Sequence, residues 1–360
     1  MWQWGPVLLL LASVAQEVAS STGDQGDVYR ACLHHCPHVG CAHFLNHPHR
    51  CHQAACNPAL PTPFSLRLTA WSCDADCKYL CMQEVEGDRR TVGHKPQKYY
   101  GKWPFIRILG VQEMASVVFS LANLAMHIVG MLQLLSASKK RALGQPQRGH
   151  SKRFTYPFTG WWLAYGGFHV AAWGASAVFH TRDLPITERI DYVCAILVVA
   201  MGLMVSLVRT LNRPGLWAAL PLVLLVGAGA VWHVGYMLTV SWHYAWNIKV
   251  CVAAGVLTAL VWVVWILHHP AHPGRWWLLA FLGLAHAALL LELLDFPPIL
   301  GSLLHEKGLP TVTHMGTTGL GLVDAHALWH LATVPLTAVF YRFITTDVMS
   351  WDSKPHTNLD

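Results

Sequence analysis

The sequence predicts an all-α membrane protein with seven transmembrane helices and an N-terminal luminal cysteine-rich domain. First, 54% of the 360 residues are apolar and only 12% are charged, about half the charged share of soluble domains. Second, eight of the ten cysteines lie within residues 32–81. Third, seven apolar stretches have the length of roughly 20 residues that a helix needs to cross a bilayer. This composition argues against a cytosolic enzyme and a nucleic-acid-binding protein.

Residues 1–20 are predicted to be a signal peptide. The apolar run 7–14 is too short to span a bilayer, and small residues follow it around Ala19 and Ser20. We expect cleavage near Ser20, which would leave the mature N-terminus in the secretory lumen. Because the segment lacks Lys and Arg, an uncleaved first transmembrane helix is the alternative interpretation.

Residues 21–105 are predicted to form a luminal disulfide-rich domain. An even number of cysteines within fifty residues, behind a signal peptide, indicates a disulfide framework in an oxidising compartment. Histidines alternate with these cysteines, so zinc binding is the alternative, and the pairing stays open. The eight cysteines are Cys32, Cys36, Cys41, Cys51, Cys56, Cys73, Cys77 and Cys81.

Residues 106–345 are predicted to form the seven-helix transmembrane domain, and residues 346–360 a cytoplasmic tail. The loops after the first, third and fifth spans carry nine Lys and Arg, whereas the other loops carry four. Positive charge favours the cytoplasmic side, so the N-terminus is expected in the lumen and the C-terminus in the cytoplasm. The spans are predicted at about residues 111–132, 158–179, 192–211, 216–239, 245–267, 276–294 and 322–343.

Five polar residues are predicted to lie in one layer near the luminal ends of three spans. Ser176 and His180 end the second span, Asp191 begins the third, and His326 and His330 begin the seventh. Ionisable groups inside membrane helices are costly, so each is a candidate functional residue. The orientation was derived from other residues, so the shared depth is independent support for a site.

The spacing of these residues favours a catalytic zinc site. Residues four apart share a helix face, so His326 and His330 point the same way, as do Ser176 and His180. Three imidazoles would leave the fourth zinc position to water, whose pKa the metal lowers. Asp191 is then a candidate to orient this water or to act as general base, and Ser176 is a candidate donor to a developing oxyanion.

Other polar residues of the spans have less specific interpretations. Three histidines whose depths miss the luminal layer are interpreted as packing residues, namely His127, His169 and His286. His233 lies toward the luminal end of the fourth span and could support the site. The acidic residues Glu113, Glu292 and Asp295 of the first and sixth spans could be structural, support the site or relay protons. Asp324 is a candidate cap for the last helix.

Several motifs resemble the PER-like family, which acts in fatty-acid remodelling of GPI anchors. They are WSCDADC at 71–77, GKWPF at 101–105, SAVFH at 176–180, LELLDFPP at 291–298 and DAHALWH at 324–330. The resemblance covers residues 26–343. In its helices and its Ser, Asp and His residues, the family is similar to alkaline ceramidases and adiponectin receptors, the CREST superfamily of membrane hydrolases.

The resemblance implies a GPI-specific phospholipase A2-type activity in the Golgi membrane. The reaction would remove the unsaturated sn-2 acyl chain from the phosphatidylinositol of GPI-anchored proteins, within the luminal leaflet. The superfamily's zinc ligands carry over to His180, His326 and His330, and its Ser and Asp to Ser176 and Asp191. The family places its LDFPP and DAH motifs close together, whereas residues 299–323 separate them here, as an insertion or an artefact such as a retained intron.

Two other functions are compatible with the same residues. A ceramidase-like enzyme would use the same zinc chemistry on an amide bond. A seven-helix receptor or a non-catalytic escort of GPI-anchored proteins would need no layer of zinc ligands. The cysteine-rich domain favours a protein-linked lipid substrate over a free lipid.

Overall fold

The computed structural model describes residues 21–39, 64–144, 156–298 and 321–351, and these residues confirm the all-α class. These described residues contain no β-strand, and their β-type pairing is limited to two isolated antiparallel bridges. The predicted signal peptide and three of the clustered cysteines, Cys41, Cys51 and Cys56, lie outside the described residues.

The chain divides into two compact units, which are described separately. Unit 1 comprises residues 1–118, 177–187 and 291–329, and unit 2 comprises residues 119–176, 188–290 and 330–360. Five long helices contribute residues to both units, so the chain passes between the units several times.

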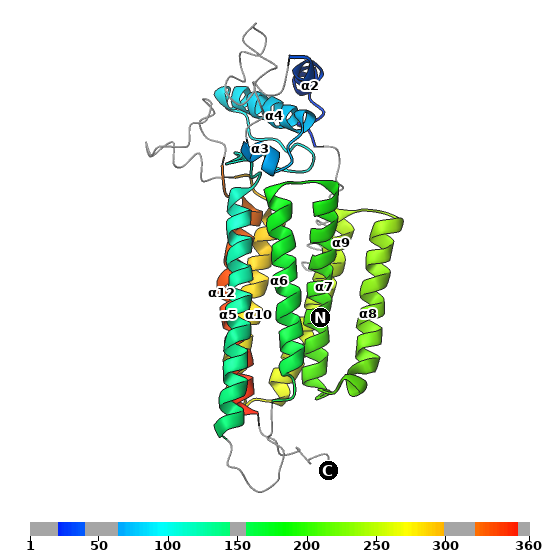
Figure 1. The fold of residues 1–360 in the computed structure, drawn as a ribbon, viewed down its shortest axis with the longest axis vertical. Helices are drawn as coiled ribbons and strands as arrows, with labels where there is room; N and C mark the ends of the chain where they lie inside the picture. Colours follow the sequence, from blue (N-terminus) through cyan, green and yellow to red (C-terminus); the bar gives the residue numbers. More distant parts are fainter. Residues whose placement is uncertain (1–20, 40–63, 145–155, 299–320, 352–360) are drawn as a thin grey trace, which may run out of the picture. The chain divides into compact units, whose positions relative to one another are not determined.

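Two helices linked by disulfides form the core of the cysteine-rich part of unit 1. Helix α2 spans Asp27–Val39 and helix α4 spans Cys73–Thr91 (Figure 1). Disulfides join Cys32 to Cys81 and Cys36 to Cys77, which makes the two helices antiparallel. On both helices the paired cysteines are four residues apart and so share one face. The structure therefore confirms disulfides for these four of the eight predicted cysteines.

Helix α4 begins where local sequence chemistry favours a helix start. The Ser72 hydroxyl accepts a hydrogen bond from the Ala75 backbone N–H at 3.2 Å, which caps the first turn. Asp74 and Asp76 lie in that turn, where negative charge complements the helix dipole. Cys73, the first residue of the helix, is also disulfide-bonded.

The segment that follows α4 contains two tight turns of the same kind. Tyr99 and Lys102 exchange both backbone hydrogen bonds, at 2.8 and 3.0 Å, across Tyr100 and Gly101, which both have positive φ. This is the pattern of a type I′ turn. The second turn, at residues 108–111, places Gly110 so close to helix α3 (Phe64–Leu68) that a Cβ would lie 2.7 Å from the Ser65 carbonyl oxygen.

Among the described residues, seven long helices follow the N-terminal segment. Six of them are long and apolar enough to cross a membrane, as the membrane-protein prediction requires. The remaining one, α6, coincides with the second predicted span, but its Trp, Tyr, Gly and His residues lower its hydropathy, so the count of seven spans stays a prediction. The helices are α5 (Met114–Gly144), α6 (Thr159–Thr181), α7 (Pro185–Thr210), α8 (Leu216–Thr239), α9 (Tyr244–His268), α10 (Arg275–Leu294) and α12 (Ala325–Ser350).

Unit 2 has an aromatic-rich core to which all seven long helices contribute. Trp162, Trp262 and Phe343 are almost fully buried at its centre. Gly130 of α5 lets Tyr341 of α12 approach closely, because a Cβ there would lie 2.2 Å from the tyrosine ring. Close packing of this kind gives a helical unit a single arrangement.

A buried ion pair lies among these aromatic residues. The Arg209 guanidinium of α7 donates two hydrogen bonds to the Asp347 carboxylate of α12, at 2.8 and 2.5 Å. Tyr156 donates a short hydrogen bond to the same carboxylate, and His272 Nε2 lies 3.2 Å from it. Asp347 is fully buried, so this network satisfies a charge that would otherwise be costly.

Candidate metal centre

Two helices supply the three predicted histidine ligands. His180 lies in the last turn of α6, whereas His326 and His330 lie one turn apart at the start of α12. The Asp324 side chain caps α12, since it accepts a hydrogen bond from the Ala327 N–H at 2.8 Å, as the sequence predicted. This cap fixes where the helix begins and therefore which face carries both histidines.

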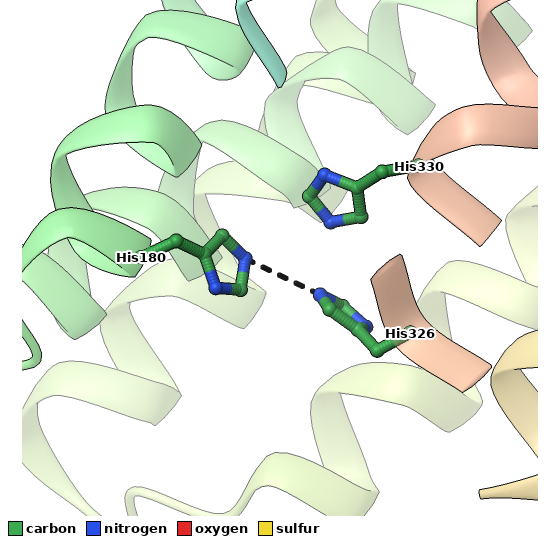
Figure 2. Close-up of side chains that lie close together, drawn as sticks. All are labelled: His180, His326 and His330. Atoms are coloured by element: carbon green, nitrogen blue, oxygen red, sulfur yellow. Dashed lines mark hydrogen bonds between the residues drawn. The ribbon is translucent and has the colours of Figure 1, made fainter. Parts of the chain in front are cut away.

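The three histidines form a group that could hold a metal ion (Figure 2). One ring nitrogen from each lies within 4.8 Å of the others, and His180 Nε2 lies 3.3 Å from His326 Nε2. Two nitrogens bound tetrahedrally to zinc at about 2.0–2.1 Å would lie roughly 3.3–3.4 Å apart. His180 and His330 are buried, and the side chain of His326 is 32% exposed.

Carboxylates behind two of the rings determine which nitrogens face the centre. His180 Nδ1 lies 2.7 Å from Glu113 Oε2, and His326 Nδ1 lies 2.6 Å from Glu292 Oε2. An ionised carboxylate only accepts hydrogen bonds, so each Nδ1 carries a proton, and in a neutral ring Nε2 is then the nitrogen with the lone pair. With both rings neutral, two lone pairs would face each other at 3.3 Å; a proton shared in the Nε2–Nε2 contact drawn in Figure 2 or a bound cation removes that repulsion. The donor set therefore fits a zinc ion.

A different group supports the third histidine. Within unit 2, His330 Nδ1 lies 2.9 Å from Ser120 Oγ, and Asn123 donates a hydrogen bond to the His330 carbonyl oxygen at 2.8 Å. Ser120 Oγ lies 3.1 Å from Ser176 Oγ, which links the predicted serine to the His330 ring. Because Nδ1 is engaged, Nε2 is the nitrogen of His330 that is available to a metal.

Sequence reasoning did not identify Ser120 and Asn123, although a signal for them exists. Together with Glu113, Ser116 and His127, they recur at intervals of three or four along residues 113–127, which places them on one face of α5. Serine and asparagine alone are common in membrane helices, where they bond to neighbouring helices. The periodic stripe would have distinguished them from isolated polar residues.

Asp191 is a predicted site residue that does not belong to the candidate metal group of the three histidines. It lies near the start of α7 and is partly exposed. Among the described residues, the candidate metal ligands within reach of one another are the three histidines and do not include Asp191. Its role as general base stays a prediction.

The other membrane histidines have contacts of their own within unit 2. The His127 and His169 rings stack at 4.1 Å between centroids, and His233 Nε2 lies 3.0 Å from Asn247 Oδ1. His286 Nδ1 bonds the Leu282 carbonyl oxygen at 2.6 Å, one turn earlier on its helix. These contacts suit packing residues, and none of these four histidines belongs to the candidate metal group of the described residues.

The structure thus defines a multi-pass helical membrane protein with a candidate three-histidine metal centre. The model of the Per1-like family matches residues 63–305 and 317–348, which is most of the chain. The chain belongs to the Per1-like family. The unmatched residues 306–316 lie inside the predicted insertion at 299–323 and outside the described residues.

Curated relatives match the chain along nearly its whole length. "GPI-specific phospholipase A2-like PGAP3" of Mus musculus is 33% identical over 348 residues, covering 95% of this chain and 93% of the relative. The Homo sapiens protein of the same name is 32% identical, with 94% and 93% covered. "Post-GPI attachment to proteins factor 3" of Drosophila melanogaster is 32% identical, with 94% and 92% covered. No solved structure matches the chain significantly.

Proposed function

We propose that this protein remodels GPI anchors by removing the sn-2 unsaturated acyl chain from the phosphatidylinositol of GPI-anchored proteins. The reaction would be a zinc-dependent ester hydrolysis at His180, His326 and His330. The observation that carries this proposal is the three-histidine group, in which two facing Nε2 atoms lie 3.3 Å apart with carboxylates behind their rings. The relatives named as GPI-specific phospholipase A2-like support the choice of substrate.

The surrounding residues suit the separate tasks of such a reaction. A zinc ion bound there would supply Lewis-acid chemistry for the ester carbonyl. Glu113 and Glu292 fix the tautomers of two ligands, as carboxylates do in other histidine metal sites. The Ser176 hydroxyl would donate a hydrogen bond to the charge that develops on the ester oxygen. Asp191 would accept a proton from the attacking water.

The proposed location is the Golgi membrane, with the N-terminus in the lumen and the C-terminus in the cytoplasm. The charge bias of the loops supports this orientation, and the two disulfides are compatible with an oxidising lumen. A site on the luminal side would meet GPI anchors in the leaflet that holds them.

The proposal is tested by mass spectrometry of GPI anchors from cells that lack the protein. Rescue with the wild type should restore saturated sn-2 chains, whereas the double variant His326→Ala/His330→Ala should restore none, because two of three ligands are lost. His286→Ala is the matched control, since its exposed ring lies in α10 and bonds backbone outside the site. It should rescue like the wild type.

The same cells distinguish the competing functions. Full remodelling by the double variant would overturn a catalytic metal site and favour an escort function. Unchanged GPI anchors together with accumulated ceramide in cells lacking the protein would favour the amide hydrolase. Zinc content of the purified wild type and double variant gives a readout that is independent of activity.

A further inference from the structure

A lysine from the cysteine-rich part of unit 1 reaches the carboxylate behind His180. Lys102 Nζ lies 2.5 Å from Glu113 Oε1 and 3.1 Å from Asp183 Oδ2, and 4.1 Å from the centre of the Phe179 ring. Although burial alone would lower the pKa of Lys102, the two carboxylates hold it above its usual range. Lys102 is therefore a fixed positive charge in this part of unit 1.

Glu113 connects this lysine to the candidate metal ligand. One carboxylate oxygen accepts from Lys102 and the other from His180 Nδ1, so both oxygens are engaged and the group has one orientation. The backbone holds the same register, since Glu113 N–H donates to the His180 carbonyl oxygen at 3.0 Å. Loss of Lys102 would leave Oε1 without this partner and allow the carboxylate to rotate away from His180.

The disulfide-linked helix α4 in turn holds the segment that carries Lys102. Gln83 of α4 donates to the Phe105 carbonyl oxygen at 2.7 Å, and the Tyr99 hydroxyl donates to Glu86 at 3.0 Å. Tyr99 and Lys102 close the first type I′ turn, so an anchor at Tyr99 also places Lys102. Contacts thus run without interruption from α4 to His180.

Residues 98–103, which include Lys102, also contact Asp295 just after helix α10. Trp103 Nε1 donates to Asp295 Oδ1 at 3.0 Å, and Lys98 forms a short ion pair with the same carboxylate. Asp295 follows the end of α10, three residues after Glu292, whose carboxylate contacts His326. Residues 98–103 therefore contact Glu113 directly and Asp295, which lies near Glu292.

We propose that Lys102 is a positioning residue of the metal centre, which acts through Glu113 to orient His180. The folded cysteine-rich part of unit 1 thereby determines how well the site binds its metal. This inference rests on the proposed function, because it assumes a metal at the three histidines. It adds a residue outside the transmembrane helices to the machinery of the site.

The decisive experiment is a double-mutant cycle on zinc affinity, measured by chelator competition on the purified full-length protein. Lys102→Met and Glu113→Gln should each weaken zinc binding by roughly 10–100-fold, as losses of supporting partners do at other metal sites. The double variant should bind zinc more tightly than Glu113→Gln alone. In Glu113→Gln alone, Lys102 donates to the amide oxygen of the new side chain, so the amide NH₂ faces His180 Nδ1–H. When Lys102 is also replaced, the amide oxygen can rotate toward His180 and accept its hydrogen bond.

A merely structural role would not produce this recovery of zinc affinity in the double variant, because two independent structural defects would give additive losses of affinity. Lys95→Met is the matched control, since Lys95 is an exposed lysine of the same unit. It should leave zinc affinity unchanged, and thermal melting should show that all variants are folded. Unchanged affinity in folded Lys102→Met, or strictly additive losses in the cycle, would overturn the inference. A folded wild type that binds no zinc would instead overturn the proposed function.

Discussion

The buried Arg209–Asp347 pair allows a prediction about stability that does not depend on the proposed chemistry. Asp347→Asn keeps the side-chain shape but leaves Arg209 without its buried counter-charge, which costs about 3–5 kcal/mol where one partner of such a pair is removed. Arg209→Met should lie at the lower end of that range. Tyr156 donates a hydrogen bond to the Asp347 carboxylate and His272 Nε2 lies 3.2 Å from it, so the carboxylate would keep two polar partners.

The double variant Arg209→Met/Asp347→Leu should be much closer to the wild type than either single variant. Replacing both charges with apolar groups of similar size is often neutral, because no charge then stays buried alone. Arg209 also packs against Phe158, Trp265 and Trp351, with its guanidinium carbon 4.8–5.2 Å from their ring centres. Methionine can retain part of that packing.

The assay is reversible unfolding of the purified protein in mixed micelles of increasing denaturing detergent. The exposed Arg213, shortly after α7, gives the control variant Arg213→Met, which should change the free energy of unfolding by no more than about 0.5 kcal/mol. If the double variant lost the sum of the two single losses, the charges would not be coupled and the reasoning would be refuted.

Two further predictions concern the site and the topology. Ser120→Ala should weaken zinc binding by roughly tenfold or more, because it removes the partner of His330 Nδ1; Ser176→Ala should keep the metal and lower activity by about 100- to 1,000-fold, the usual loss for one oxyanion donor. Equal zinc loss in both variants would contradict this division, with zinc content and GPI lipid composition as the measurements. Protease protection of intact Golgi vesicles should preserve a tag after residue 20 and remove a tag at Asp360; a protected C-terminal tag would disprove the proposed orientation.

The parts of the fold that the sequence could predict depend on local periodicity. Apolar stretches of membrane-spanning length predict the long helices. Helix geometry alone then places His326 with His330, and Cys77 with Cys81, on shared helix faces, because the residues of each pair are four apart. The Asp324 cap is local in the same way. Six of the seven predicted spans are among the helices long and apolar enough to cross a membrane, whereas α6 mixes its apolar residues with Trp, Tyr, Gly and His.

The parts that could not be predicted depend on contacts between residues distant in the chain. Spacing did not say which cysteines pair, since several pairings satisfy it, and the structure selects Cys32–Cys81 and Cys36–Cys77. Lys102 lies in the GKWPF motif at 101–105, but the motif does not give its role, because that role comes from contacts with Glu113 and Asp183. The polar periodicity of residues 113–127 could have marked Ser120 as a candidate, but not its partner, because His330 is 210 residues away.

The charges around His180 and His326 give an independent argument for a divalent ion. Within unit 1, four carboxylates lie around these histidines, Glu113, Glu292, Asp183 and Asp324, together with the cations Lys102 and Arg182. With both imidazoles neutral, these groups carry a net charge of −2. Excess charge of one sign in a largely buried place is costly. A divalent cation at the Nε2 atoms would bring the sum to zero, whereas a single shared proton would leave −1. The charge balance and the 3.3 Å separation of the two nitrogens therefore favour the same occupant.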